Sequence, residues 1–206
     1  MTEEQQTEEP APSSKATTYF LVIALIVIIA VLGYIFFGVK LVQPEPEKIE
    51  YSYFTFTEIG GLWQTNIQLK DRLYDAVFRF NPKQVEEVYV TGQLENLTGP
   101  IYITFDPVQN EDDYKYLALA SSELSLHLVR ALEKEVIAAC TSNETDACLE
   151  RPVVTCSDQD KSVIYLNTYP PTQITLNGTC VMLQGEKMEL LKSVDRLLFQ
   201  WYRVMG

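Results

Sequence analysis

The sequence predicts an α+β protein in which an N-terminal transmembrane helix is followed by one extracytoplasmic domain of antiparallel sheet with two packed helices. Three observations predict it: an uncharged apolar run near the N-terminus, alternating strand patterns after it, and two later helical patterns with strand-like runs between them. The expected boundaries are a disordered acidic tail over 1–15, the transmembrane helix over 16–39, a Pro/Glu spacer over 40–48 and the domain over 49–206.

The apolar run lies between Lys15 and Lys40. A helix rises about 1.5 Å per residue, so about 24 residues reach about 36 Å, enough to cross a hydrocarbon core of about 30 Å. A cleaved signal peptide has an apolar core of about 7–15 residues after a basic start, whereas this run is longer and follows acidic residues. A buried core helix would show a polar stripe, which this run lacks. We therefore expect residues 16–39 to remain in the lipid bilayer.

The orientation of this helix rests on the residues that follow it, because Lys and Arg are nearly balanced around it. All four cysteines lie on the C-terminal side, as expected of disulfides in an oxidising space. Three glycosylation sequons lie there too, at Asn96, Asn143 and Asn177, although about one would arise by chance. We expect a single-pass cell-membrane protein with its N-terminus inside and its domain outside.

The charge balance excludes one class of partner. The chain carries 28 Asp and Glu against 16 Lys and Arg, a formal net charge of −12. A surface of this sign repels phosphate backbones, so no nucleic-acid partner is expected. The acidic tail is expected to solubilise rather than to bind.

The first half of the domain predicts a meander of three antiparallel strands. Apolar and polar residues alternate over 63–70, which places one face on a core. A β-branched and aromatic run over 49–56 precedes this strand, and another strand over 74–80 follows it. Residues 82–90 fit either one helical turn or an edge strand, and residues 101–105 fit a central strand.

Two helical patterns complete the domain, over about 112–140 and about 186–205. The first would carry Glu111, Asp112 and Asp113 in its first turn, where the helix dipole favours acids. Four strand-like runs lie between the helices, at 153–156, 163–166, 173–176 and 180–183. Asn177-Gly178 predicts a hairpin between the last two.

The cysteine spacing favours two local bridges, Cys140–Cys148 across a polar loop and Cys156–Cys180 between predicted strands. This is one of the three pairings that four cysteines allow. Zinc ligands usually come in pairs two to four residues apart, and these gaps are wider, so no metal site is expected.

The sequence predicts neither a catalytic residue set nor a cofactor site. The one histidine, His127, lies beside predicted core leucines and is interpreted as a helix-boundary residue on the shoulder of an apolar face. The run from Asn110 to Asp113 lacks the spaced oxygen ligands of a calcium loop, and helix capping explains it better. Ser121, Ser122 and Ser125 lack the glycines of a nucleophile elbow.

Several segments together resemble a group of uncharacterised, single-pass, membrane-anchored surface proteins of small-genome archaea. These segments are 101–107, 118–124, 153–156, 178–180 and 195–202. The resemblance covers most of the chain after the apolar run. It implies an archaeal cell surface and a shared cysteine set, and it brings no activity with it.

These observations favour a non-enzymatic accessory or interaction module of the cell envelope, whose expected partners are the lipid bilayer and another envelope protein. The alternative is a hydrolase-like envelope enzyme that uses dispersed carboxylates, for which Asp106, Glu123 and Asp195 are the candidates because each borders an apolar element. A small-molecule sensor is a third hypothesis, and it requires a pocket.

Overall fold

The computed structural model describes residues 14–38, 45–108 and 111–206. It divides the chain into two compact units, Met1–Glu45 and Pro46–Gly206. Residues 1–13 of the predicted tail and 40–44 of the predicted spacer lie outside the described residues.

The first unit holds helix α1, Ser14–Gly33, which continues as the π-helical turn η1, Tyr34–Gly38. Residues Lys15–Phe36 have a mean hydropathy of 2.9 and are long and apolar enough to cross a membrane. Leu21, Ile26 and Ile29 are each about 60% exposed, so apolar side chains point outward all around the helix.

The second unit begins with a four-stranded antiparallel sheet in the order β1, Lys48–Tyr51; β2, Phe54–Ile59; β3, Leu62–Leu69; and β4, Arg72–Phe78. The prediction of one strand over 49–56 is wrong, because the chain turns between β1 and β2. Ser52 takes a positive φ of 52° there without a glycine or proline. The alternation predicted for β3 is confirmed, with Trp63, Thr65 and Ile67 buried.

A six-stranded mixed sheet forms the other side of the domain. Its order is β5, Tyr89–Leu94; β9, Gln173–Gly178; β10, Cys180–Gln184; β8, Ser162–Asn167; β6, Ile101–Phe105; and β7, Val136–Ala138. The expectation of a purely antiparallel sheet is wrong: apart from the β9–β10 hairpin, every neighbouring pair is parallel. Parallel neighbours require crossover connections, and helix α2, Tyr114–Arg130, is the crossover from β6 to β7.

The first helical pattern was extended too far at both ends. Glu111–Asp113 form the short 3-10 turn η4 before α2, so these acids precede the first helical turn instead of lying in it. The helix ends at Arg130, and Glu133, with a positive φ of 55°, redirects the chain into β7. A short apolar run such as 136–139 fits a strand or a continued helix equally well, which explains the error.

The structure also decides two smaller points, one left open by the sequence and one predicted wrongly. Residues 82–90 contain both open alternatives, the 3-10 helix η3, Pro82–Val85, and the start of edge strand β5. Residues 153–156 form no strand, and only an isolated bridge joins Val153 to Cys140.

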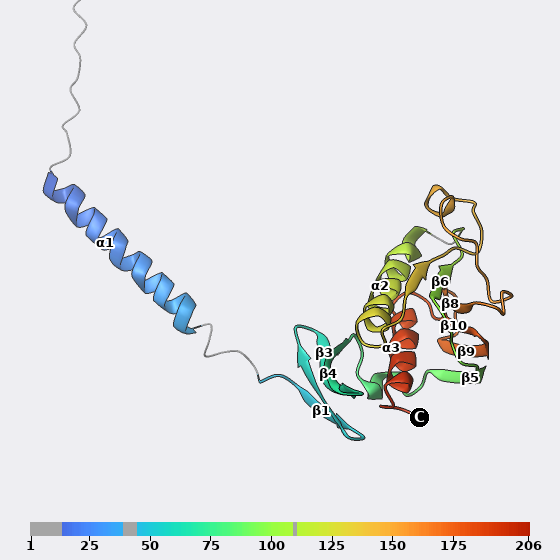
Figure 1. The fold of residues 1–206 in the computed structure, drawn as a ribbon. Helices are drawn as coiled ribbons and strands as arrows, with labels where there is room; N and C mark the ends of the chain where they lie inside the picture. The colour runs from blue at the N-terminus through green and yellow to red at the C-terminus, as the bar shows by residue number, and fades with distance from the viewer. Residues whose placement is uncertain (1–13, 39–44, 109–110) are drawn as a thin grey trace, which may run out of the picture. The chain divides into compact units, whose positions relative to one another are not determined.

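Helix α3, Glu189–Trp201, lies with α2 between the two sheets (Figure 1). Its Phe199 ring packs 5.6 Å from Phe56 and 4.4 Å from Phe78 of the antiparallel sheet, measured between ring centroids. Val194 and Leu198, also on α3, belong to the same core cluster as Ile174 and Leu183 of the mixed sheet. Because α3 is covered on both sides, its polar residues Ser193, Asp195 and Arg196 are buried too.

Candidate functional site

Two of the three candidate carboxylates meet at Arg79, at the end of β4. Arg79 donates through Nε and Nη2 to one oxygen of Glu123, on α2, with the Nε bond at 3.0 Å. Asp195 Oδ2, on α3, accepts from the backbone N–H of Arg79 at 3.0 Å and of Phe80 at 2.8 Å. The third candidate, Asp106, lies elsewhere and accepts from the backbone N–H of Val108.

Asp195 is 1% exposed, and its environment favours a structural role. Burial raises the pKa of this carboxyl well above its ordinary value, and the charge of Glu123 raises it further, against the lowering effect of the backbone donors and of Arg79. Both N–H bonds go to one oxygen and hold the chain where β4 leads into η3. Asp195 therefore fastens α3 to the antiparallel sheet.

His127 is 4% exposed, so its assignment to the shoulder of an apolar face is wrong. Its Nε2 lies 2.9 Å from the carbonyl oxygen of Val77, which can only accept, so Nε2 carries the hydrogen. Its Nδ1 lies 2.8 Å from the Tyr202 hydroxyl and accepts from it. Burial lowers the pKa of His127 and keeps the ring neutral. Both nitrogens are thus occupied, and neither is free to take a proton from a substrate.

A cleft of about 240 Å³ opens between β4 and α2 beside these groups. It is lined by Leu62, Tyr74, Asp75, Val77, Phe78, Arg79, Glu123, Leu126, His127 and Arg130. Its central polar groups are engaged with one another or with the backbone, as described above for Arg79 and His127. The cleft joins two layers of the fold, and the charges of Arg79 and Glu123 are paired within it.

A larger cavity, of about 400 Å³, lies on another side of α2, against β6 and β7. It is lined by Ile103, Phe105, Tyr114, Leu117, Ala118, Ser121, Ser122, Ser125, Ala138 and Arg151. Phe105 and Ala138 end their strands, so the cavity is at the carboxyl edge of the β6–α2–β7 crossover. Ligands of α/β sheets bind at this edge, and the volume falls within the range of ligand pockets, about 300–1,000 Å³.

Of the cavity's polar groups, the Tyr114 hydroxyl donates to the carbonyl oxygen of Pro107, and the others have no partner in the described part of the chain. The hydroxyls of Ser121, Ser122 and Ser125 make no hydrogen bond to any described residue, and no described carboxylate pairs with Arg151. The sequence contained one weak signal for them, three serines along a helix that otherwise buries leucines. Arg151 gave no signal, because only the fold brings its loop to α2.

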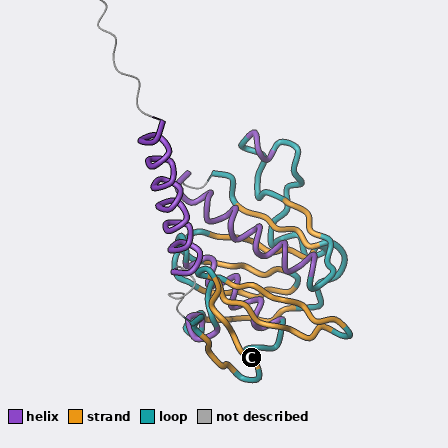
Figure 2. Tube along the Cα trace, turned by 90° about the vertical axis from the view of Figure 1, so that its left-hand side faces the viewer, coloured by secondary structure: helices purple, strands orange, loops and turns teal. Residues whose placement is uncertain are grey.

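The first disulfide holds that loop. The structure joins Cys140, two residues after β7, to Cys148 at the end of the short helix η5, Asp146–Cys148. The backbone of Cys140 also bonds to Pro152 and Val154, on either side of the neighbouring bridge residue Val153. Figure 2 shows this loop projecting beside the start of α2, as does Figure 1. Arg151 is therefore tied to the edge strand at two points.

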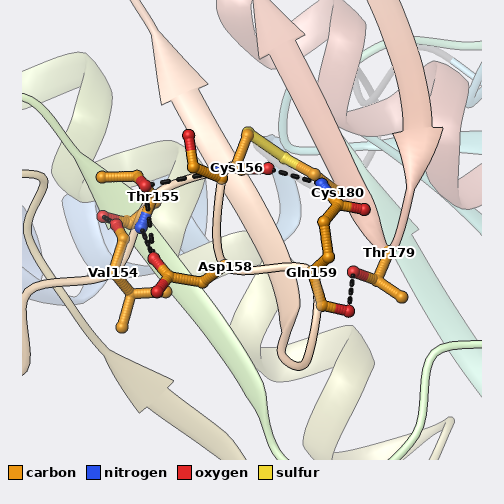
Figure 3. Close-up of a disulfide and its surroundings, with 9 residues drawn as sticks. Val154, Thr155, Cys156, Asp158, Gln159, Thr179 and Cys180 are labelled. Atoms are coloured by element: carbon orange, nitrogen blue, oxygen red, sulfur yellow. Dashed lines mark hydrogen bonds between the residues drawn. A yellow bond between two sulfur atoms is a disulfide. The ribbon is translucent and has the colours of Figure 1, made fainter.

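The second disulfide joins Cys156 to Cys180, so both pairs are those favoured from the spacing. It connects the irregular segment after Val154 to the first residue of β10 (Figure 3). Asp158 closes this segment by accepting from the backbone N–H of Thr155 at 2.8 Å, and Thr179 donates to the carbonyl oxygen of Gln159. Neither of its cysteines is among the described residues that line the cavity.

Three further observations bear on function. The sequon asparagines Asn96, Asn143 and Asn177 are all exposed, and their glycosylation stays a prediction. Within residues 14–38, 45–108 and 111–206, no group of three or more His, Cys, Asp or Glu residues could hold a metal ion. Comparison with protein-family models, curated proteins and solved structures finds no match, so the resemblance to archaeal surface proteins also stays a prediction.

Proposed function

We propose that this protein is a single-pass membrane protein whose second unit acts outside the cell membrane as a non-enzymatic interaction module. The observation that carries the proposal is α1. The apolar window of this helix is 0% buried, so no described residue covers it. Fully burying an apolar side chain such as Leu21 or Ile26 is worth about 1.5–3 kcal/mol relative to leaving it in water, and exposure to water would forgo this energy. A bilayer is the surrounding that covers all sides of such a helix.

The disulfides support the outside placement of the second unit. Two bridges and no free cysteine are found there. Disulfides form and persist in oxidising spaces and are rare in the cytosol. The N-terminal segment would then lie inside, since one helix separates the two ends.

A non-enzymatic role is supported by how the reactive groups are used. Asp195 binds backbone donors, Glu123 pairs with Arg79, and His127 joins Tyr202 to Val77. An acid–base mechanism that relied on these three groups would need at least one of them free to exchange a proton with a substrate.

Protease accessibility in intact cells tests the placement. Added protease is expected to degrade the 46–206 unit and to spare an epitope placed before residue 14. Alkaline carbonate should leave the chain in the membrane, and the intact mass should include α1. If the unit is protected until lysis, the orientation is reversed; if the mass lacks α1, the helix is a cleaved signal sequence.

A capture experiment tests the interaction role. Mild solubilisation and affinity capture of the full chain, followed by mass spectrometry, should recover one envelope protein at near-equal amount. The control is the same chain captured after reduction of its disulfides. The interaction role would be contradicted if the reduced chain captured the same envelope protein equally well. It would also be contradicted if no partner protein were recovered in several mild detergents.

A further inference from the structure

We propose that the cavity between α2, β6 and β7 binds a small organic acid, with its carboxylate on Arg151 and its apolar body against the sheet. This site goes beyond the anchoring and partner role proposed above and does not depend on either. Four features of the described residues carry it: the volume, the apolar floor, the free hydroxyls and the charge at the rim.

The floor selects an apolar body. Ile103 and Leu117 are 3% and 4% exposed, and Phe105 and Tyr114 are half-buried beside them. A ligand that covers this surface removes apolar area from water on both the protein and the ligand. This burial is the main favourable contribution to small-molecule binding. A cavity of about 400 Å³ accommodates a compact aromatic or branched group.

The polar groups select the head of the ligand. Arg151 has the only charged side chain among the described residues that line the cavity, and a guanidinium binds a carboxylate through two parallel hydrogen bonds. Ser121 and Ser125 are half-buried and can donate to the same oxygens or to a second polar group. The protein as a whole is acidic, so a cation at the rim of this cavity is a local exception.

The fold holds the backbone that carries these groups before a ligand arrives. The serines stand on a regular helix, and Arg151 follows a segment closed by the Cys140–Cys148 bridge. A preformed site loses little conformational entropy on binding, which raises its affinity.

The test compares naphthylacetate with naphthylacetamide, two probes of nearly equal shape that differ in charge. Binding to the full chain in lipid nanodiscs is measured by titration calorimetry, with empty nanodiscs subtracted. We expect the carboxylate to bind about ten-fold more tightly or better. Arg151→Gln should remove that preference and leave amide binding unchanged, while Arg203→Gln, at an exposed arginine outside the cavity, should change neither.

A second variant tests the location. Ala118 is exposed on α2 and lines the cavity, so Ala118→Trp should fill the volume without disturbing the core and should abolish binding of both probes. Unchanged melting of this variant would show that the fold is intact. The proposal is overturned if neither probe binds, if Arg151→Gln keeps the charge preference, or if folded Ala118→Trp still binds. Each of these results leaves the membrane topology experiment unaffected.

Discussion

Helix α2 borders two hollows of opposite character. In the cleft against β4, the charged and titratable groups Arg79, Glu123 and His127 are bonded to partners within the fold. In the cavity against β6 and β7, the walls are apolar, and the serines and Arg151 have no partner among the described residues. The comparison indicates that a dense group of reactive side chains can serve the fold alone. The groups available to bind a ligand are those that the fold leaves unpaired.

The largest expected effect tests the structural half of this comparison. Asp195→Ala would leave the backbone N–H groups of Arg79 and Phe80 buried without an acceptor, at a cost of about 1–3 kcal/mol each. Against a total stability of about 5–15 kcal/mol, this is a severe loss. Urea unfolding of the full chain in nanodiscs measures it.

Asp195→Asn is the matched control, since its amide oxygen can still accept from both donors and it buries no carboxyl. It should cost clearly less than Asp195→Ala. If both variants unfold like the wild type, Asp195 does not fasten α3, and a chemical role for this carboxyl becomes the better explanation.

The two disulfides separate stability from binding. In the chain-entropy model, the 24-residue separation of Cys156–Cys180 stabilises by about 3.5 kcal/mol and the 8-residue separation of Cys140–Cys148 by about 2.5 kcal/mol. Replacing Cys156 and Cys180 by Ser should lower the melting temperature by about 7–14 °C, and replacing the other pair by about 5–10 °C.

Ligand binding should follow the opposite order. The Cys140–Cys148 pair holds the loop of Arg151, so its replacement should weaken naphthylacetate binding at a temperature where the domain is still folded. Replacement of Cys156 and Cys180 should leave binding intact under the same conditions. Equal effects of the two pairs on binding would show that loop position does not control the cavity.

The fold was predictable where local pattern and tertiary environment agree. The alternation over β3 and the leucine spacing of α2 meet this condition, because one face of each lies on the core. Ser52 and Val136 show where prediction failed: a turn made by a non-glycine residue and a three-residue strand have no distinctive local pattern. Parallel pairing was also missed, since it depends on which edge each crossover returns to.

The candidate residues were predictable by type and not by role. Glu123 and Asp195 were singled out because they border apolar elements, and the structure brings both to Arg79. That Asp195 would be buried followed from α3 being covered by two sheets, which no helical period in one segment reveals. Arg151 reaches the cavity through a bridge and a loop, contacts that are distant from any pattern around residue 151.

The pH dependence of stability is a smaller expected effect that also tests the cleft. Burial holds the pKa of His127 below its ordinary value of 6.5, so the native state binds fewer protons than the unfolded state below that pH. The unfolding free energy should therefore fall as pH drops through 6.5, by at most about 1.4 kcal/mol per pH unit. His127→Gln keeps hydrogen-bonding groups without titrating and should flatten this slope. A wild-type curve as flat as that of the variant would mean that His127 takes up a proton as readily in the folded state.

The smallest effect concerns the ion pair itself. The side chains of Arg79 and Glu123 are 27% and 21% exposed, so solvent screens their attraction, and Glu123→Gln should destabilise by about 1 kcal/mol or less. A double-mutant cycle with Arg79→Gln isolates the pair, and its coupling energy should shrink as salt is raised. Glu133→Gln is a suitable comparison, because its pairs with Lys70 and Arg72 are more exposed and should contribute still less. A coupling energy of several kcal/mol that does not change with salt would contradict a simple ion pair. It would mean that Glu123 also supports the buried Asp195. The cleft would then be one coupled unit, in clear contrast to the cavity, whose serines and Arg151 are unpaired.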